Sequence, residues 1–224
     1  MISGPYLEQP AFRPHSPAEL MVDRQIHRAG VAAGVVGAAG LAVAAAGSGS
    51  AALLISCLAY GAGLLAMLLC SAVYNQAQES PRRELFRRLD HAAIFVMIAG
   101  TYTPFTINRL PPAWGLTMTL IVWAAALSGA LLKLARPGFL ERISVVPYLA
   151  VGWIGVIALR PLFLVLDSET LALLAIGGGL YTLGTVFHLW HRLPYQNSVW
   201  HGFVMLAAGC HYVAIYHAVI GTAS

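Results

Sequence analysis

The chain has 224 residues, of which 58% are hydrophobic and only 10% are charged. Soluble globular proteins average about 45–50% and about 25%, so this chain has too few charged side chains to cover a water-facing surface. Its net charge of +4 at pH 7 is small and spread along the sequence, which does not indicate nucleic-acid binding. The composition therefore excludes a soluble enzyme and indicates a protein that crosses a membrane several times.

Seven stretches are long and apolar enough to cross a bilayer as helices, each of about 17–25 residues. They are residues 29–47, 50–74, 91–107, 113–132, 143–166, 171–190 and 199–220. None of them alternates polar and apolar residues as a barrel strand does. The sequence predicts an all-α integral membrane protein with seven transmembrane helices. Residues 1–28 are expected to form a cytoplasmic segment, and residues 29–224 the transmembrane domain.

The segment ahead of the first span carries a helix-start signal. Ser16, Pro17 and Glu19 match a capping box with proline at the first helical position. The signal favours either a short amphipathic helix along the cytoplasmic surface or an extension of the first span, and the two alternatives carry equal weight. The first 28 residues contain no apolar core of the kind a signal peptide needs, so none is expected.

Lysine and arginine are distributed unequally between the two sides. Eleven of the 13 lie in the N-terminal segment or in the connections after the second, fourth and sixth spans. The remaining two, Arg109 and Arg160, lie on the other side of the membrane in this topology. Because cytoplasmic loops carry the excess of positive charge, the sequence predicts a cytoplasmic N-terminus and an external C-terminus.

Polar side chains at membrane depth are costly and are functional candidates by default. Three pairs fall at the cytoplasmic ends of spans: Ser71 with Asn75 on the second, Asp90 with His91 on the third, and Asn197 with His201 on the seventh. The topology places all three pairs at one depth. Asp90 could instead cap the start of its helix, and Asn75 the end of its helix. His211 lies deeper on the seventh span and has no such structural role.

Several motifs resemble the haemolysin III family, the bacterial branch of the progestin and adipoQ receptor group of seven-helix proteins. They are SAVYN (71–75), RRLDHAAIF (87–95), AGTYTPF (99–105), VWHGFV (199–204) and Cys210-His211, with His27 ahead of the first span. The resemblance covers nearly the whole predicted membrane region, and it implies a bacterial inner membrane location.

The resemblance also implies a cytoplasm-facing centre similar to the zinc site of membrane ceramidases, where three histidines leave a position open for water. Ser71, Asp90 and His201 match the family pattern and are the candidate catalytic residues. Asn75 and Asn197 stand where the family has histidine ligands, and an amide oxygen is a poor zinc ligand beside imidazole. His91 or His211 could turn inward and complete a ligand set with Asp90 and His201.

Three hypotheses of function follow, with membrane lipids as the expected partners. The favoured one is a non-catalytic protein that binds a lipid or senses the state of the membrane. Its helices two, three and seven would be joined by a polar network of Ser71, Asn75, Asp90, Asn197 and His201. The second is a metal-dependent lipid hydrolase, in which Asp90 and His201 hold a metal or orient water and Ser71 stabilises the oxyanion. The third, membrane lysis, comes last.

Overall fold

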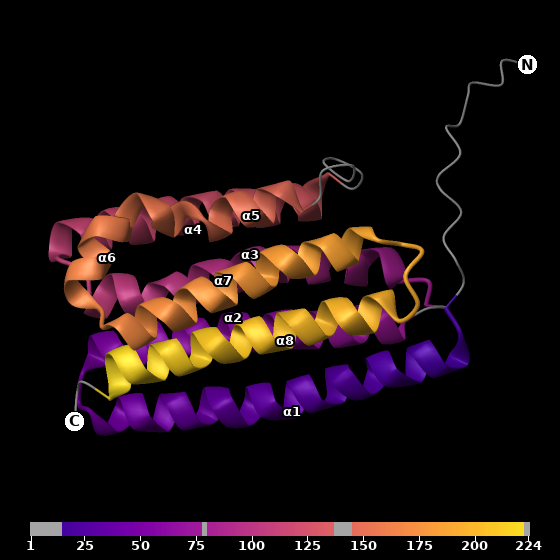
Figure 1. Ribbon diagram of the computed structural model, residues 1–224, viewed down its shortest axis with the longest axis horizontal. Coiled ribbons are helices and arrows are strands. Elements are labelled where there is room, and N and C mark those ends of the chain that lie inside the picture. The colour runs from indigo at the N-terminus through magenta and orange to yellow at the C-terminus, as the bar shows by residue number, and fades with distance from the viewer. Residues whose placement is uncertain (1–14, 78–79, 137–144, 222–224) are drawn as a thin grey trace, which may run out of the picture.

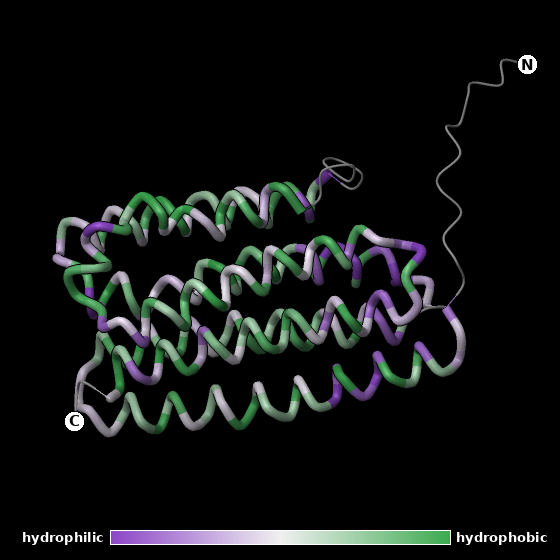
Figure 2. Tube along the Cα trace, viewed as in Figure 1, coloured by the Kyte–Doolittle hydropathy of each residue, from purple (hydrophilic) through white to green (hydrophobic). Residues whose placement is uncertain are grey.

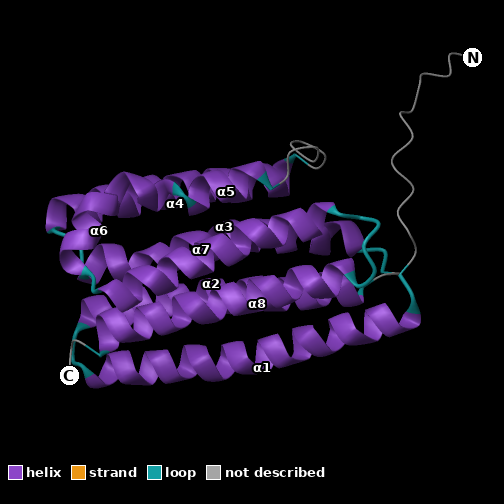
Figure 3. Ribbon diagram, in the orientation of Figure 1, coloured by secondary structure: helices purple, strands orange, loops and turns teal. Residues whose placement is uncertain are grey.

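The structure is a computed structural model that describes residues 15–77, 80–136 and 145–221. Within these ranges every regular element is a helix and there is no strand (Figure 3). In chain order they are α1 (Pro17–Gly47), α2 (Ala51–Gln76), α3 (Arg83–Asn108), α4 (Pro112–Ala135), α5 (Val146–Gly152), the 3₁₀ segment η2 (Ile154–Ala158), α6 (Leu159–Val165), α7 (Ser168–Leu189), α8 (Gln196–Ile215) and the π-helical segment η3 (Tyr216–Ile220).

The helices run side by side along the long axis of the molecule (Figure 1). α5, η2 and α6 follow one another as a single interrupted rod, and η3 continues α8. Six rods are long and apolar enough to cross a membrane, namely α1, α2, α4, Val146–Val165, α7 and Gln196–Ile220. The remaining long helix, α3, packs between α2 and α4. The prediction of an all-α multipass membrane protein is confirmed.

Residues 17–28 are the first turns of α1, and the alternative of a separate surface helix is not found. The capping box is present: the Ser16 hydroxyl accepts from the Glu19 amide at 3.3 Å, and the Glu19 carboxylate accepts from the Ser16 amide at 2.7 Å. The helix then continues without interruption to Gly47. Its buried positions recur every three or four residues, so one face packs along the bundle from the first turns onward.

α3 also begins earlier than expected, at Arg83 rather than at residue 91. Glu84 accepts hydrogen bonds from Arg87 at 2.8 Å and from Arg88 at 3.0 Å, and such pairs one turn apart support a helix. Asp90 therefore lies two turns inside the helix, and the expectation that it caps the helix start is wrong. The same charged turns explain why hydropathy identifies α3 less clearly than the other spans.

The fifth rod is interrupted where sequence patterning predicts a continuous span. α5 ends at Gly152, and the backbone changes to the 3₁₀ segment η2 before α6. The Tyr102 hydroxyl, from α3, donates to the Gly152 carbonyl at 2.5 Å and accepts from the Gly155 amide at 2.8 Å. Backbone groups freed at membrane depth need protein partners, and Tyr102 supplies both.

Hydrophilic residues gather toward the two ends of the bundle, and the middle is hydrophobic (Figure 2). The start of α1, the start of α3 and the ends of α4 and α7 lie at the same end (Figure 1). The described cations of these segments are Arg24, Arg28, Arg82, Arg83, Arg87, Arg88, Lys133, Arg136 and Arg192. Arg109 and Arg160 belong to the opposite end; Arg13 and Arg142 lie outside the described residues. The charge asymmetry is thus built into the fold, and the assignment of the positive end to the cytoplasm stays a prediction.

Candidate functional site at one end of an internal cavity

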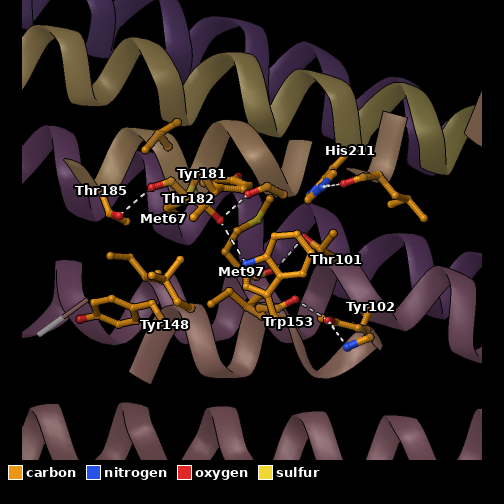
Figure 4. A pocket seen from close by; sticks show the side chains of 18 of the residues that line it. Met67, Met97, Thr101, Tyr102, Tyr148, Trp153, Tyr181, Thr182, Thr185 and His211 are labelled. Atoms are coloured by element: carbon orange, nitrogen blue, oxygen red, sulfur yellow. Dashed lines mark hydrogen bonds between the residues drawn. The ribbon is translucent and has the colours of Figure 1, made fainter. Parts of the chain in front are cut away.

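A cavity of about 390 Å³ lies inside the bundle, with side chains from α1 through α8 in its wall. Figure 4 shows part of this wall, where Met67, Met97 and Tyr148 contribute apolar surface. Leu68, Phe105, Leu162 and Val204 line it as well. The cavity is therefore mainly a hydrocarbon-lined chamber.

Most polar groups in this part of the wall are engaged by the protein itself. Thr101 donates to the Met97 carbonyl at 2.9 Å, and Thr185 donates to the Thr182 carbonyl at 2.7 Å. The Trp153 indole donates to the Thr182 hydroxyl at 3.1 Å, which links the junction of α5 and η2 to α7 (Figure 4). The protons of these groups are therefore taken by protein acceptors, whereas the Tyr148 hydroxyl, also in the wall, has no hydrogen-bond partner among the described residues.

At the polar end of the cavity an imidazole from α8 contacts a carboxylate from α1. His201 lines the cavity, whereas Asp23 is not part of the lining. His201 Nδ1 lies 2.6 Å from Asp23 Oδ1. The two side chains are 13% and 9% exposed, so the pair is largely shielded from solvent and lipid. The His27 ring packs edge-on against the His201 ring, with centroids 4.3 Å apart.

His27 connects this pair to α2. Its Nδ1 lies 2.8 Å from the Asp23 backbone carbonyl and 3.5 Å from Asp23 Oδ2, and its Nε2 lies 3.2 Å from Ser71 Oγ. Since a carbonyl only accepts, Nδ1 carries a proton, which leaves Nε2 of the neutral ring as an acceptor that faces the Ser71 hydroxyl. Asn75 in turn donates to Ser71, to its carbonyl at 3.0 Å and its hydroxyl at 3.4 Å.

The structure brings some of the predicted site residues together and leaves others apart. Ser71, Asp90 and His201 all line the cavity, and Asp90 interacts with both of the other two. Asn75 and Asn197 are not part of the cavity lining. Asn75 lies next to the last residue of α2, and its amide nitrogen donates to the Ser71 carbonyl of the same helix.

The two proposed substitute ligands do not join this centre. His91 lines the cavity but interacts with Lys133 and His188. His211 sits farther along α8, where its Nε2 is 3.4 Å from the Leu174 carbonyl and its ring packs on Tyr181. Among the described residues, the group placed to share a metal ion is Asp23, His27 and His201.

Sequence reasoning missed Asp23 and His27 as site residues. An amphipathic surface helix, one of the two alternatives for this segment, would place the charged Asp23 on its polar face, whereas both side chains are buried. A signal was available, because the two residues are one helical turn apart just ahead of an apolar run, which aligns them on one helix face. The burial of this face could be inferred only from the start of α1 at Pro17 and from its packing on α2 and α8.

This fold and site define a class of protein. It is a polytopic helical membrane protein with a buried centre of histidine and carboxylate side chains at one end of an internal cavity. The family model described as "Haemolysin-III related" matches residues 20–212. The chain belongs to that family.

Named relatives agree with the family assignment. The chain is 35% identical to "Hemolysin-3 homolog" of Bacillus subtilis (strain 168), over 80% of this chain and 84% of that protein. It is 32% identical to "Hemolysin-3" of Bacillus cereus, over 79% and 80%. A more distant relative is human "Monocyte to macrophage differentiation factor", 28% identical over 70% and 67%. No solved structure matches the chain.

The three-histidine zinc set implied by the resemblance does not fit this chain at the family positions. Of those positions only His201 carries an imidazole, while Asn75 and Asn197 carry amides. Asn75 directs its amide nitrogen, which cannot bind a cation, toward Ser71. A possible metal-binding triad is present nonetheless, with two of its three members on α1.

Proposed function

We propose that the protein binds a membrane lipid inside the bundle, with the acyl chain in the cavity and the headgroup at the polar end. The cavity carries this proposal, because it joins a hydrocarbon-lined chamber to Ser71, Asp90 and His201. Ligand pockets of about 300–1,000 Å³ with apolar walls and a few convergent polar groups are typical of small-molecule sites. The cavity of about 390 Å³ falls in that range.

The fifth rod supports lipid entry from the side. Trp153, Val156 and Phe163 line the cavity, yet they are 45%, 50% and 63% exposed on the surface of the bundle. These side chains therefore sit at the boundary between the chamber and the lipid that surrounds the helices. A lipid tail would cross there without leaving an apolar environment, which keeps the cost of entry low.

The polar end matches a headgroup rather than a second hydrocarbon tail. Ser71, His27 and His201 line this end, and Asp23 contacts both histidines from outside the lining. These groups offer donors and acceptors in a setting shielded from water, where a matching polar group would gain more than at the surface. The residues that form this polar network differ from those expected from the sequence. The contacts join α1, α2 and α8 through Asp23, His27, Ser71 and His201, with Asn75 bonded to Ser71. Asn197 is not one of the partners found in the described part of the chain.

Two adjacent glycines on α7 offer a matched test. A Cβ at Gly178, which lines the cavity, would lie 3.6 Å from the Trp153 ring, an ordinary contact. A Cβ at Gly179 would meet no described atom within 4 Å. We expect lipid to co-purify with the wild type and Gly179→Phe but not with Gly178→Phe, as measured by mass spectrometry of the purified protein. Absence of bound lipid from the wild type, or equal lipid in both variants, would contradict lipid binding in this cavity.

A second candidate function is hydrolysis of a lipid amide or ester at the same end of the cavity. The specific observation in its favour is the Ser71 hydroxyl, 3.2 Å from a histidine nitrogen that accepts its proton. Turnover of lipid amides and esters in nanodiscs tests it, with Ser71→Ala against the exposed Ser128→Ala as control. Turnover that survives in Ser71→Ala would exclude this serine from the reaction.

Membrane lysis is the third candidate, and it is motivated by the names of the Bacillus relatives. The helices are already committed to crossing one membrane, which argues against lysis of another. Dye release from liposomes by the purified protein tests it. We further propose the inner membrane of a bacterium as the location, on the strength of those two bacterial relatives.

A further inference from the structure

The strongest cluster of metal-ligand side chains joins the first helix to the last long one. Asp23 and His27 lie one turn apart on α1, and His201 lies on α8. Each offers one ligand atom, and these atoms all fall within 4.8 Å of one another. From this cluster we infer that the protein holds a divalent transition-metal ion of the Zn²⁺ class between α1 and α8, bound by Asp23, His27 and His201.

The donor set suits such an ion. Two imidazoles and one carboxylate form a common ligand set of catalytic zinc sites, and such sites leave a fourth position open. Imidazole favours zinc-like ions over calcium or magnesium, which prefer all-oxygen sites. The spacing of Asp23 and His27 is the i, i+4 spacing that lets two ligands on one helix reach the same ion.

Neighbouring groups orient the rings as metal-binding histidines require. The Asp23 carbonyl accepts from His27 Nδ1 and so leaves the Nε2 lone pair available. Ser71 Oγ, 3.2 Å from that nitrogen, is positioned to hydrogen-bond a group at the open position. The ligand set is thus supported by α2 as well as by the two helices that carry it.

The local charge balance also favours a cation. In the described part of the chain, the ion-pair partners of the buried Asp23 carboxylate are these two imidazoles. A buried carboxylate is costly unless positive charge offsets it. A divalent cation bound by the carboxylate and the two imidazoles would offset that charge.

The site keeps one of the three family positions, His201, and does not use the other two. Asn75 and Asn197 replace two histidines on α2 and α8, while α1 supplies Asp23 and His27 next to the retained His201. The metal centre has in effect moved toward the first helix. This inference stands apart from the lipid-binding proposal, because metal content can be measured whether or not the cavity holds a lipid.

The decisive measurement is zinc content by elemental mass spectrometry, after incubation with Zn²⁺ and removal of excess metal. We expect about one zinc per chain in the wild type and in His211→Ala, which removes a histidine outside the cluster, and zinc loss in His27→Ala and His201→Ala. Zinc retained in His27→Ala, or no zinc in the wild type, would overturn the inference.

A second measurement on the wild type guards against variants that fail to fold. Zn²⁺ should raise the thermal unfolding temperature of the wild type in detergent and a chelator should reverse the rise, whereas Mg²⁺ should have no effect. Wild-type protein that gains no thermal stability from Zn²⁺ would contradict a site between α1 and α8. Lipid that co-purifies without any metal would leave the lipid-binding proposal intact and refute this one.

Discussion

His201 Nδ1 lies 2.6 Å from Asp23 Oδ1, although 178 residues separate them in the sequence. The contact closes the bundle, because α1 and α8 are the first helix and the last long helix of the chain. It also places a carboxylate from α1 against a histidine that the sequence motif assigns to a separate centre on helices two, three and seven. The chemistry of this end of the cavity is therefore governed by α1 as much as by the motif-bearing helices.

The first prediction concerns this pair. In the presence of a chelator, a double-mutant cycle of Asp23→Ala and His201→Ala should give a coupling of about 0.5–3 kcal/mol in the free energy of unfolding. Either substitution alone removes the buried charge-assisted hydrogen bond. The second substitution then removes a side chain that has already lost this bond, so the two effects are not additive. Unfolding in mixed detergent monitored by tryptophan fluorescence provides the measurement. The control cycle pairs Asp23→Ala with His211→Ala and should be additive; coupling of equal size in both cycles would contradict a direct pair.

The second prediction tests the interrupted fifth rod. Tyr102→Phe removes the hydroxyl that serves both the Gly152 carbonyl and the Gly155 amide. Leaving these groups unsatisfied away from water should destabilise the protein by about 1–3 kcal/mol. Tyr216→Phe is the control, because that side chain is 48% exposed and should change little. Equal unfolding temperatures for the two variants would show that the hydroxyl does not hold the break.

The third prediction tests the close approach of α3 and α4. A Cβ at Gly115 would overlap the Thr106 carbonyl oxygen, a backbone atom that cannot rotate away. The same region holds the Thr119 to Thr106 hydrogen bond of 2.7 Å. Gly115→Ala should therefore destabilise the protein by about 1–3 kcal/mol. Gly179→Ala, with no described atom within 4 Å of its Cβ, should be neutral or slightly stabilising, and thermal unfolding compares the two.

The fourth prediction is a pH dependence outside the membrane-spanning segments. Hydrogen bonds from Arg87 and Arg88 lower the pKa of Glu84 from 4.5 to about 2. Because the folded pKa is the lower one, the contribution of Glu84 is present above the ordinary value and is lost as the pH falls toward about 2. Glu84 is exposed, so its loss should cost less than about 1 kcal/mol. Glu84→Gln should lower the unfolding temperature near neutral pH and match the wild type at the acid end; a difference that grows on acidification would be the wrong sign.

Hydropathy predicted the number and order of the long helices because each of them contains an apolar run long enough to cross a membrane. The start of α3 was placed too late, since charged turns at membrane ends look like loops, and the start of α1 was left open between two alternatives. Glu84 with Arg87 and Arg88 instead continues α3. The break after Gly152 depends on Tyr102, fifty residues away, which no local pattern reveals.

The site was predicted in part for the same reason. Ser71, Asp90 and His201 meet at the cavity because regular helices of similar length bring one depth of the membrane together. Asp23 and His27 were missed because their burial is decided by the packing of α1 on two other helices. Whether the residues named from the motif carry chemistry stays a prediction for the experiments above.

The contact between the first and last long helices can form only at a late stage of synthesis. Asp23 and His27 enter the membrane region at the start of synthesis, whereas His201 is added only after six long rods have been made. Until α8 arrives, the carboxylate has no imidazole from the far end of the chain to balance it, and holding it at membrane depth is costly. A chain that stops short of α8 therefore lacks the α8 partner of its Asp23 carboxylate, and its first helix is expected to pack less stably.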